Sequence, residues 1–126
     1  MKIWVNGCFD ILHRGHFELF NYAKSLGNVL VVGVDSDEKI TQDKGPDRPY
    51  NKLEDRVYAL ESLKAIDKVM VFDNKEHLEW LVEITKPDIL VVGSDWKGKE
   101  IVGGQYAKEI VYFDRIGDYS TTDILK

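Results

Sequence analysis

Residues 2–34 decide the fold of this chain and read KIWVNGCFDILHRGHFELFNYAKSLGNVLVVGV. The segment opens with an apolar stretch of strand length, Lys2 to Val5, which ends at an Asn-Gly turn. Phe17 to Leu26 follow with apolar residues spaced by four and three, which places them on one face of a helix. Val29 to Val34 form a continuous apolar run that is typical of a strand buried on both faces. The segment therefore predicts a strand–helix–strand unit.

The rest of the chain repeats this alternation. Three more apolar runs have the length of strands: Lys68 to Phe72, Ile89 to Val92 and Glu109 to Phe113. Helices are predicted after three capping residues, Asn51, Asn74 and Ser120. Between Asp35 and Tyr50 the chain is polar, without apolar periodicity, so we expect a long loop there, with at most a helical turn near Asp37. Strands that alternate with helices form parallel sheets, and the sequence predicts an α/β fold: a single doubly wound domain over residues 1–126 with five parallel strands.

Composition excludes several functional classes. The 126 residues carry 17 basic and 22 acidic side chains, a formal charge of −5 that suits a nucleic-acid backbone poorly. A single cysteine cannot form an internal disulfide. The longest apolar runs are far shorter than the roughly 20 residues that span a bilayer. We therefore expect a soluble, cytoplasmic domain without nucleic-acid or membrane partners.

The functional site of a doubly wound sheet lies beyond the carboxyl ends of its strands. This rule selects four segments of the chain: Gly7–His16, Asp35–Arg48, Gly93–Lys97 and Arg115–Thr122. The first of them joins a glycine turn to a helix start, where backbone N–H groups and the positive end of the helix dipole attract anions. His13 and His16 flank Gly15, so both imidazoles can face one ligand, and the segment suits a polyphosphate.

Two other interpretations of this segment stay open. The histidines could simply be surface residues at a helix start. A zinc site could use Cys8, His13 and His16, although this spacing matches no common finger pattern and a second cysteine is missing. Asp10 could bind a metal, or tie the loop to the backbone.

The segment resembles the Gly-x-Phe-Asp-x-x-His-x-Gly-His signature of the cytidylyltransferase-like nucleotidyltransferases. Every specified position is matched, by Gly7, Phe9, Asp10, His13, Gly15 and His16. A second signature of that family, Ser-Thr-Thr at the start of the last helix, resembles Ser120-Thr121-Thr122. Two residues before it the family usually has glycine, where this chain has Asp118. The resemblance spans residues 5–125 and implies a Rossmann-like nucleotidyltransferase fold.

The resemblance also implies the reaction, in which a substrate phosphate attacks the α-phosphorus of a nucleoside triphosphate and pyrophosphate leaves. The residues that it implies as catalytic are His13, His16 and Lys44. Those implied in nucleotide binding are Gly7, Cys8, Phe9, Gly15, Asp95, Arg115, Tyr119, Ser120, Thr121 and Thr122. Those implied in binding the second substrate are Asp10, Arg48, Arg56 and Trp96. Mg²⁺ is expected as the cofactor, held mainly by phosphate oxygens and water rather than by protein ligands, and a homodimer is expected.

Two branches of the family are similar to this chain. Heptose 1-phosphate adenylyltransferases resemble it at Asn6–His13 and between Lys44 and Arg56, and glycerol 3-phosphate cytidylyltransferases resemble it at Gly93–Lys99 and in Arg115. Because the first agreement is longer, we expect AMP transfer from ATP to heptose 1-phosphate, with CMP transfer from CTP to glycerol 3-phosphate as the alternative. Two further classes stay open: a nucleotide-binding module that has lost catalysis, and a flavodoxin-like redox domain, in which the two histidines would have no role.

Overall fold

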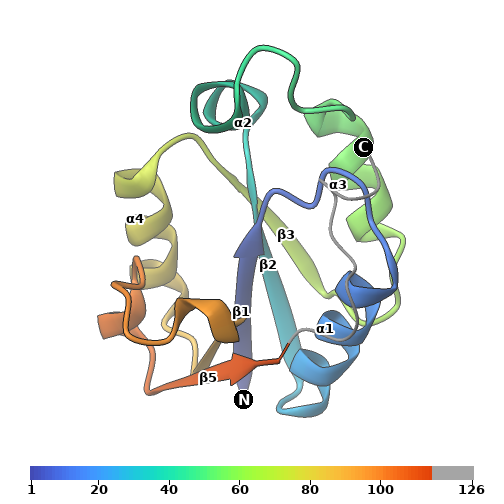
Figure 1. Cartoon of the computed structure of the whole chain (residues 1–126). Coiled ribbons are helices and arrows are strands. Elements are labelled where there is room, and N and C mark those ends of the chain that lie inside the picture. Colours follow the sequence, from blue (N-terminus) through green and yellow to red (C-terminus); the bar gives the residue numbers. More distant parts are fainter. Residues whose placement is uncertain (115–126) are drawn as a thin grey trace.

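A computed structural model describes residues 1–114 and confirms the predicted five-stranded parallel sheet (Figure 1). The strands are β1 (Lys2–Gly7), β2 (Val29–Asp35), β3 (Lys68–Phe72), β4 (Ile89–Gly93) and β5 (Glu109–Phe113). They lie side by side in the order β3-β2-β1-β4-β5, and every neighbouring pair is parallel. The strand order reverses between β1 and β4. The carboxyl ends of these two strands therefore flank the point where ligands bind in such sheets.

Alternating side chains of the central strands divide the core into two layers. Ile3 and Val5 of β1 pack with α1 (Arg14–Ser25) and α3 (Leu53–Glu61) on one face of the sheet. Trp4, between them, packs with α4 (Lys75–Thr85) on the other face. Each successive side chain of a strand points to the opposite face. The continuous apolar run of β2 follows from this, because both of its faces are covered.

The first helix begins earlier than the spacing of its apolar residues indicates. The prediction placed it from Phe17 to Leu26, whereas α1 runs from Arg14 to Ser25 with His13 as its N-cap. The first turn carries no buried apolar residue, since Phe20 and Ala23 are the buried residues of this helix. Periodicity therefore could not mark this start.

The long loop predicted from Asp35 to Tyr50 is wrong in its first half, where the structure has α2 (Asp37–Lys44). Ser36 caps this helix by accepting a hydrogen bond from the backbone N–H of Lys39, 3.3 Å away. Ile40 is the one residue of α2 that is buried, so the helix shows no apolar stripe. Its stability comes from the cap and from the acidic side chains of Asp37 and Glu38 in its first turn.

The predicted cap of the next helix is also wrong. Helix α3 has Lys52 in the N-cap position, and no side chain caps it there. The side chain of Asn51 instead donates to the backbone oxygen of Asp10, 2.7 Å away. The first turn of α3 finds its acceptor in Asp37, whose Oδ1 lies 2.9 Å from the backbone nitrogen of Leu53.

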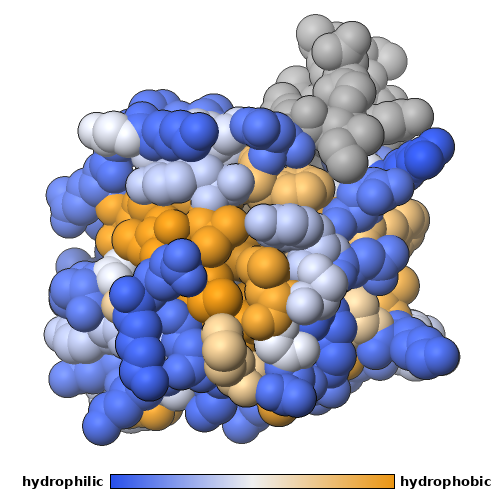
Figure 2. Space-filling model, turned by 90° about the horizontal axis from the view of Figure 1, so that it is seen from below, coloured by the Kyte–Doolittle hydropathy of each residue, from blue (hydrophilic) through white to orange (hydrophobic). Residues whose placement is uncertain are grey.

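The remaining elements follow the prediction. Asn74 caps α4 as expected. Two short 3₁₀ helices, η1 (Ser94–Trp96) and η2 (Gly104–Tyr106), fill the segment before β5. The final helix predicted after Ser120 lies outside the described residues. Within residues 1–114, no helix has the length and apolar character needed to cross a bilayer. Seen from below, at the amino ends of the strands, the surface carries an apolar area (Figure 2).

A buried arginine joins the elements at the carboxyl edge of the sheet. The side chain of Arg56 is fully buried although the residue belongs to the first turns of α3. Its guanidinium donates to the backbone oxygens of Cys8, Asp35 and Asn51 at 2.7–3.0 Å. Its Nη2 lies 2.7 Å from Oδ1 of Asp37. One side chain thereby connects the loop after β1, the end of β2, the start of α2 and the start of α3.

Replacing this arginine by an apolar residue of similar length should destabilise the fold. In Arg56→Met, the carbonyls of Cys8 and Asp35 and the carboxylate of Asp37 lose the hydrogen bonds that the guanidinium donates, and we expect a loss of about 3–5 kcal/mol in the free energy of unfolding. Urea denaturation measures this. Arg14→Met is the matched control, because Arg14 is 70% exposed and its pair with Glu18 is a surface pair worth about 0.3–0.5 kcal/mol. Equal losses of unfolding free energy in the two variants would contradict the role of Arg56 in connecting these segments.

Candidate active site

The two motif histidines form a reciprocal cap at the start of α1. Nδ1 of His13 accepts a hydrogen bond from the backbone N–H of Gly15 at 3.1 Å. Nδ1 of His16 accepts one from the backbone N–H of His13 at 3.2 Å. The rings lie 3.9 Å apart between centroids. This is a capping box in which imidazoles take the places that Ser or Thr and Glu usually occupy.

The capping box also assigns the protons of both rings. A nitrogen that accepts a hydrogen bond carries no proton, so each neutral imidazole holds its proton on Nε2. Nε2 is therefore the donor on each ring. Two N–H donors beside a helix N-terminus are groups of the kind that can bind an anion.

Aromatic packing holds His16 in place from behind. Phe9 has a positive φ of 48°, a left-handed conformation that is rare for a large side chain. Its ring is buried and lies 5.5 Å from the ring of His16 and 5.1 Å from that of Phe20. A Cβ on Gly7 would come within 3.0 Å of the Phe9 ring, so a larger residue there would require this ring to shift. These motif residues therefore shape the loop.

Asp10 ties the histidine loop to the segment before α3. The carboxylate is 2% exposed and accepts from the backbone nitrogens of Tyr50 and Asn51, both at 2.7 Å. It also pairs with Nε of Arg48 at 3.2 Å. Nη2 of Arg48 is buried and has no hydrogen-bond partner among the described residues. Asp10 is thus engaged in holding the loop, which agrees with its interpretation as a loop tie, whereas Arg48 retains a donor for a ligand.

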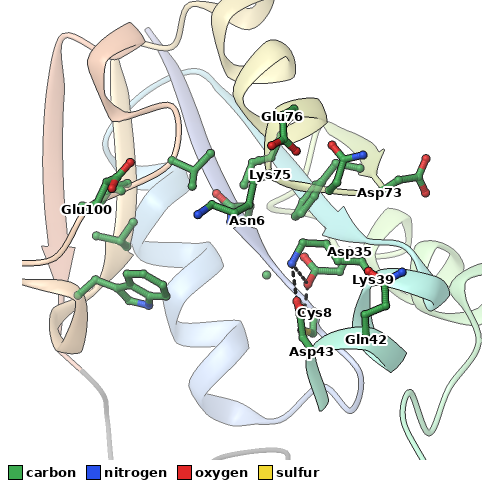
Figure 3. Close-up of a pocket in the computed structure, with 18 of the residues that line it drawn as sticks. Asn6, Cys8, Asp35, Lys39, Gln42, Asp43, Asp73, Lys75, Glu76 and Glu100 are labelled. Atoms are coloured by element: carbon green, nitrogen blue, oxygen red, sulfur yellow. Dashed lines mark hydrogen bonds and ion pairs between the residues drawn. The ribbon is translucent and has the colours of Figure 1, made fainter. Parts of the chain in front are cut away.

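A pocket of about 720 Å³ opens at the carboxyl edge of the sheet (Figure 3). Its floor is formed by the ends of β1, β2 and β4. One wall comes from α2 and the start of α4, and carries polar side chains that include Lys39, Gln42, Asp43, Asn74, Lys75 and Glu76. The facing wall comes from β4 and the segment after it, and is mainly apolar: Val92, Trp96, Ile101 and Val102. The pocket can therefore hold a molecule with one polar and one apolar side.

Only part of the predicted set lines this pocket. Gly7, Cys8 and Trp96 do so, and the half-exposed Trp96 presents its ring at the wall. The two histidines lie on the same loop as Gly7 and Cys8 but are not part of the lining. Lys44 is exposed at the end of α2, and Asp95 is exposed in η1, which follows β4.

Other members of the predicted set fall elsewhere. The prediction that Arg56 binds substrate is not supported by its position, because the side chain is fully buried and held by four protein groups. Five predicted residues lie outside the described residues: Arg115, Tyr119, Ser120, Thr121 and Thr122.

The sequence reasoning missed the segment after β3. Asp73 to Glu76 line the pocket, because the carboxyl end of β3 lies on the same edge as those of β1 and β2. The signal is the same as for the other segments, because residues 73–76 directly follow the carboxyl end of a parallel strand. Asn6 was also missed. The indole Nε1 of the buried Trp4 donates to its Oδ1 at 3.0 Å and fixes the amide at the pocket floor.

The thiol of Cys8 is a partly buried hydrogen-bond donor. Its Sγ lies 3.4 Å from Oδ2 of Asp35. Burial, reinforced by the charge of Asp35, raises the pKa of Cys8 to about 11. A protonated thiol is neither a metal ligand nor a nucleophile. Among residues 1–114, no three His, Cys, Asp or Glu side chains gather as a metal site, so the structure does not support the zinc interpretation.

The raised pKa predicts slow reaction of Cys8 with alkylating agents. The folded protein should react with iodoacetamide at a rate that rises about tenfold per pH unit until about pH 11, because only the thiolate reacts. In urea the same thiol should level off near its ordinary pKa of 9.0. The chain has one cysteine, so the rates need no assignment. A folded profile that levels off at or below pH 9 would contradict the hydrogen bond to Asp35 and the partial burial of the thiol.

Comparison with known proteins agrees with this geometry. The family model described as cytidylyltransferase-like matches residues 4–126. "Bifunctional protein HldE" of a Nitratiruptor species is 50% identical over 98% of this chain, and that of Sulfurimonas denitrificans is 44% identical over 98%. The chain spans only 27% and 26% of their lengths.

Solved structures show the same fold. The lipopolysaccharide core biosynthesis protein from Thermoplasma volcanium has a TM-score of 0.73 and 27% identity, over 95% of this chain and 98% of that one. The pantoate-beta-alanine ligase from Francisella tularensis, at 19% identity and a TM-score of 0.62 over 98% of this chain and 67% of that one, shares the fold alone. The family model covers nearly the whole sequence and includes the histidine motif, and the chain belongs to the cytidylyltransferase-like family.

Proposed function

We propose that this chain is a nucleotidyltransferase that transfers AMP from ATP to heptose 1-phosphate. The observation that carries the proposal is the capping box of His13 and His16, which presents two Nε2–H donors at the N-terminus of α1. A triphosphate that approaches this helix start meets two imidazoles, backbone N–H groups and the positive end of the helix dipole.

In the proposed reaction, an oxygen of the acceptor phosphate forms a bond to the α-phosphorus of ATP. The bond from that phosphorus to the bridging oxygen breaks, and pyrophosphate leaves with the electron pair. Such transfers need positioning and stabilisation of negative charge rather than a protein nucleophile. The two Nε2–H groups would donate to phosphate oxygens as charge builds up on them. No protein thiolate is required, in agreement with a protonated Cys8.

Cations on the flanking segments would complete the phosphate site. Lys44 is exposed at the end of α2, where its side chain can reach a bound triphosphate. Arg48 offers the buried Nη2 that lacks a hydrogen-bond partner among the described residues. We assign to Arg115 and to Tyr119–Thr122 the nucleotide contacts that the family signature implies. Mg²⁺ would neutralise the phosphates when bound, held by their oxygens and by water.

The acceptor assignment rests on the relatives and on the pocket. The HldE proteins are 40–50% identical to this chain, which favours the heptose branch of the resemblance. A pocket with a polar wall opposite Trp96 suits a sugar, which has hydroxyls on its edges and apolar C–H faces. The alternative, CMP transfer to glycerol 3-phosphate, is favoured by the segment Gly93–Lys99, which carries this tryptophan.

We place the reaction in nucleotide-sugar synthesis for a surface polysaccharide, in keeping with the name of the Thermoplasma structure.

We also propose a cytoplasmic homodimer. The apolar area at the amino ends of the strands lies at the edge opposite the pocket, where a second copy could cover it without blocking substrates (Figure 2). Sedimentation equilibrium tests this directly, and a single species of 14.5 kDa would refute the dimer.

Pyrophosphate release in a two-by-two grid tests the function. ATP and CTP are each combined with heptose 1-phosphate and with glycerol 3-phosphate, in the presence of Mg²⁺. We expect turnover with ATP and heptose 1-phosphate only. Turnover only with CTP and glycerol 3-phosphate would replace the proposal by its alternative. Tight nucleotide binding without turnover in any combination would instead indicate a silent binding module.

Two substitutions of His16 test whether the activity depends on its Nε2–H donor. Asparagine places its Oδ1 near the position of Nδ1 and so keeps the cap, but it lacks the Nε2–H donor. His16→Asn should therefore lower kcat/KM about 10²–10³-fold while the variant keeps the circular dichroism spectrum of the folded protein. Glutamine places its amide N–H near the position of Nε2, and His16→Gln should retain more activity than His16→Asn. Equal activity of wild type and His16→Asn would contradict the assigned role.

A further inference from the structure

The polar side of the pocket is organised around one lysine. Nζ of Lys39 lies 2.6 Å from Oδ2 of Asp43 and 3.4 Å from Oδ2 of Asp35. Its side chain is 17% exposed, and the ammonium lies 5.8 Å from the centre of the Phe72 ring. Figure 3 shows the three side chains meeting on one side of the cavity, with Glu100 on the opposite side. The lysine is therefore fixed in place rather than extended into solvent.

The lining of the pocket is acidic. Two lysines, Lys39 and Lys75, face five carboxylates, those of Asp35, Asp43, Asp73, Glu76 and Glu100. A second phosphate or a carboxylate on the acceptor would be repelled in this cavity. Neutral hydroxyl groups would be favoured, because each can donate to a carboxylate oxygen and accept from an ammonium or amide. The reacting phosphate is then best placed outside the cavity, toward the motif histidines.

Lys39 determines whether the carboxylates of Asp35 and Asp43 can accept hydrogen bonds from the hydroxyl groups of an acceptor. Desolvation opposes its charge, but the hydrogen bond to Asp43 and the charge of Asp35 outweigh it and raise the pKa of Lys39. The charged lysine neutralises its two neighbours in part and fixes the direction of their remaining lone pairs. Cys8 donates to the same Oδ2 of Asp35, which further fixes that carboxylate. Without the lysine, Asp35 and Asp43 would repel each other and move apart.

We propose that Lys39, held between Asp35 and Asp43, is a specificity-determining residue that binds the hydroxyl groups of the acceptor sugar and makes the pocket selective for an uncharged, hydroxyl-rich carbon chain. This inference rests on the proposed function, since it assumes a phosphorylated sugar as acceptor. It goes beyond it by assigning acceptor recognition to α2, at a residue outside both family signatures. Glycerol 3-phosphate, with only two hydroxyls, would gain less from this cluster than a heptose.

The test measures the kinetics of Lys39→Met, which keeps an unbranched apolar stem against Phe72 and removes the ammonium. We expect KM for heptose 1-phosphate to rise about tenfold or more, the effect of losing a hydrogen bond to a charged group. KM for ATP and kcat should change less than twofold. Lys39→Arg should restore part of the affinity for the acceptor. Preference for heptose 1-phosphate over glycerol 3-phosphate, as a ratio of kcat/KM values, should fall in Lys39→Met.

Lys75→Met is the matched control. It removes the same charge from the lining, from a lysine for which no ion pair is observed among the described pocket residues. Equal increases of the acceptor KM in both variants would overturn the proposal, because the total charge of the lining, and not the position of Lys39, would then determine the affinity. An unchanged acceptor KM in Lys39→Met would overturn it outright, and so would a parallel loss of melting temperature and kcat, which a purely structural lysine would cause. Failure of the proposed function is separate: wild-type protein would then show no turnover with the heptose phosphate.

Discussion

Burial of the Arg56 guanidinium is the interaction on which the carboxyl edge of this sheet depends. A buried charge is tolerated only when hydrogen bonds replace its hydration, and here backbone oxygens from three segments do so together with Asp37. Those segments are the loop that carries the histidines, the end of β2, and the turn into α3. The arginine thus fixes the position of the histidine loop relative to the pocket at the carboxyl edge, although its side chain is closed off from both by burial.

The strands and the site edge could be predicted because their signals are local. The apolar runs at residues 29–34 and 89–92 identify buried strands by themselves, and the order of elements then implies a parallel sheet. Helix α2 escaped prediction because Ile40 is its one buried residue, so no periodicity marks it. Asn51 looked like a helix cap, but Asp10, 41 positions away, recruits it. Contacts between distant positions decide such cases, and sequence patterns do not contain them.

The candidate site divides in the same way. The histidine pair is visible in the sequence because its signature is short and specific. The pocket is not visible in the sequence, because its lining comes from the ends of four strands, from α2, from the start of α4 and from the segment after β4. Its polar members are ordinary surface residue types. Lys39 and Asp43 become noticeable only when α2 pairs them and places the ammonium of Lys39 over the ring of Phe72. The structural role of Arg56 could not be predicted either, because an arginine in the first turns of a helix is usually exposed and this one is buried.

The reciprocal cap at α1 has a consequence for how this site can change during evolution. A helix cap is worth about 1 kcal/mol, a noticeable share of the stability of a small domain. Selection for folding therefore acts on His13 and His16 independently of selection for chemistry. A lineage that no longer needed the reaction would still gain from keeping acceptors at both positions. Substitution of these histidines by short polar residues that cap helices would then cost the least stability. The loss of function in such descendants should therefore leave the architecture of the loop intact.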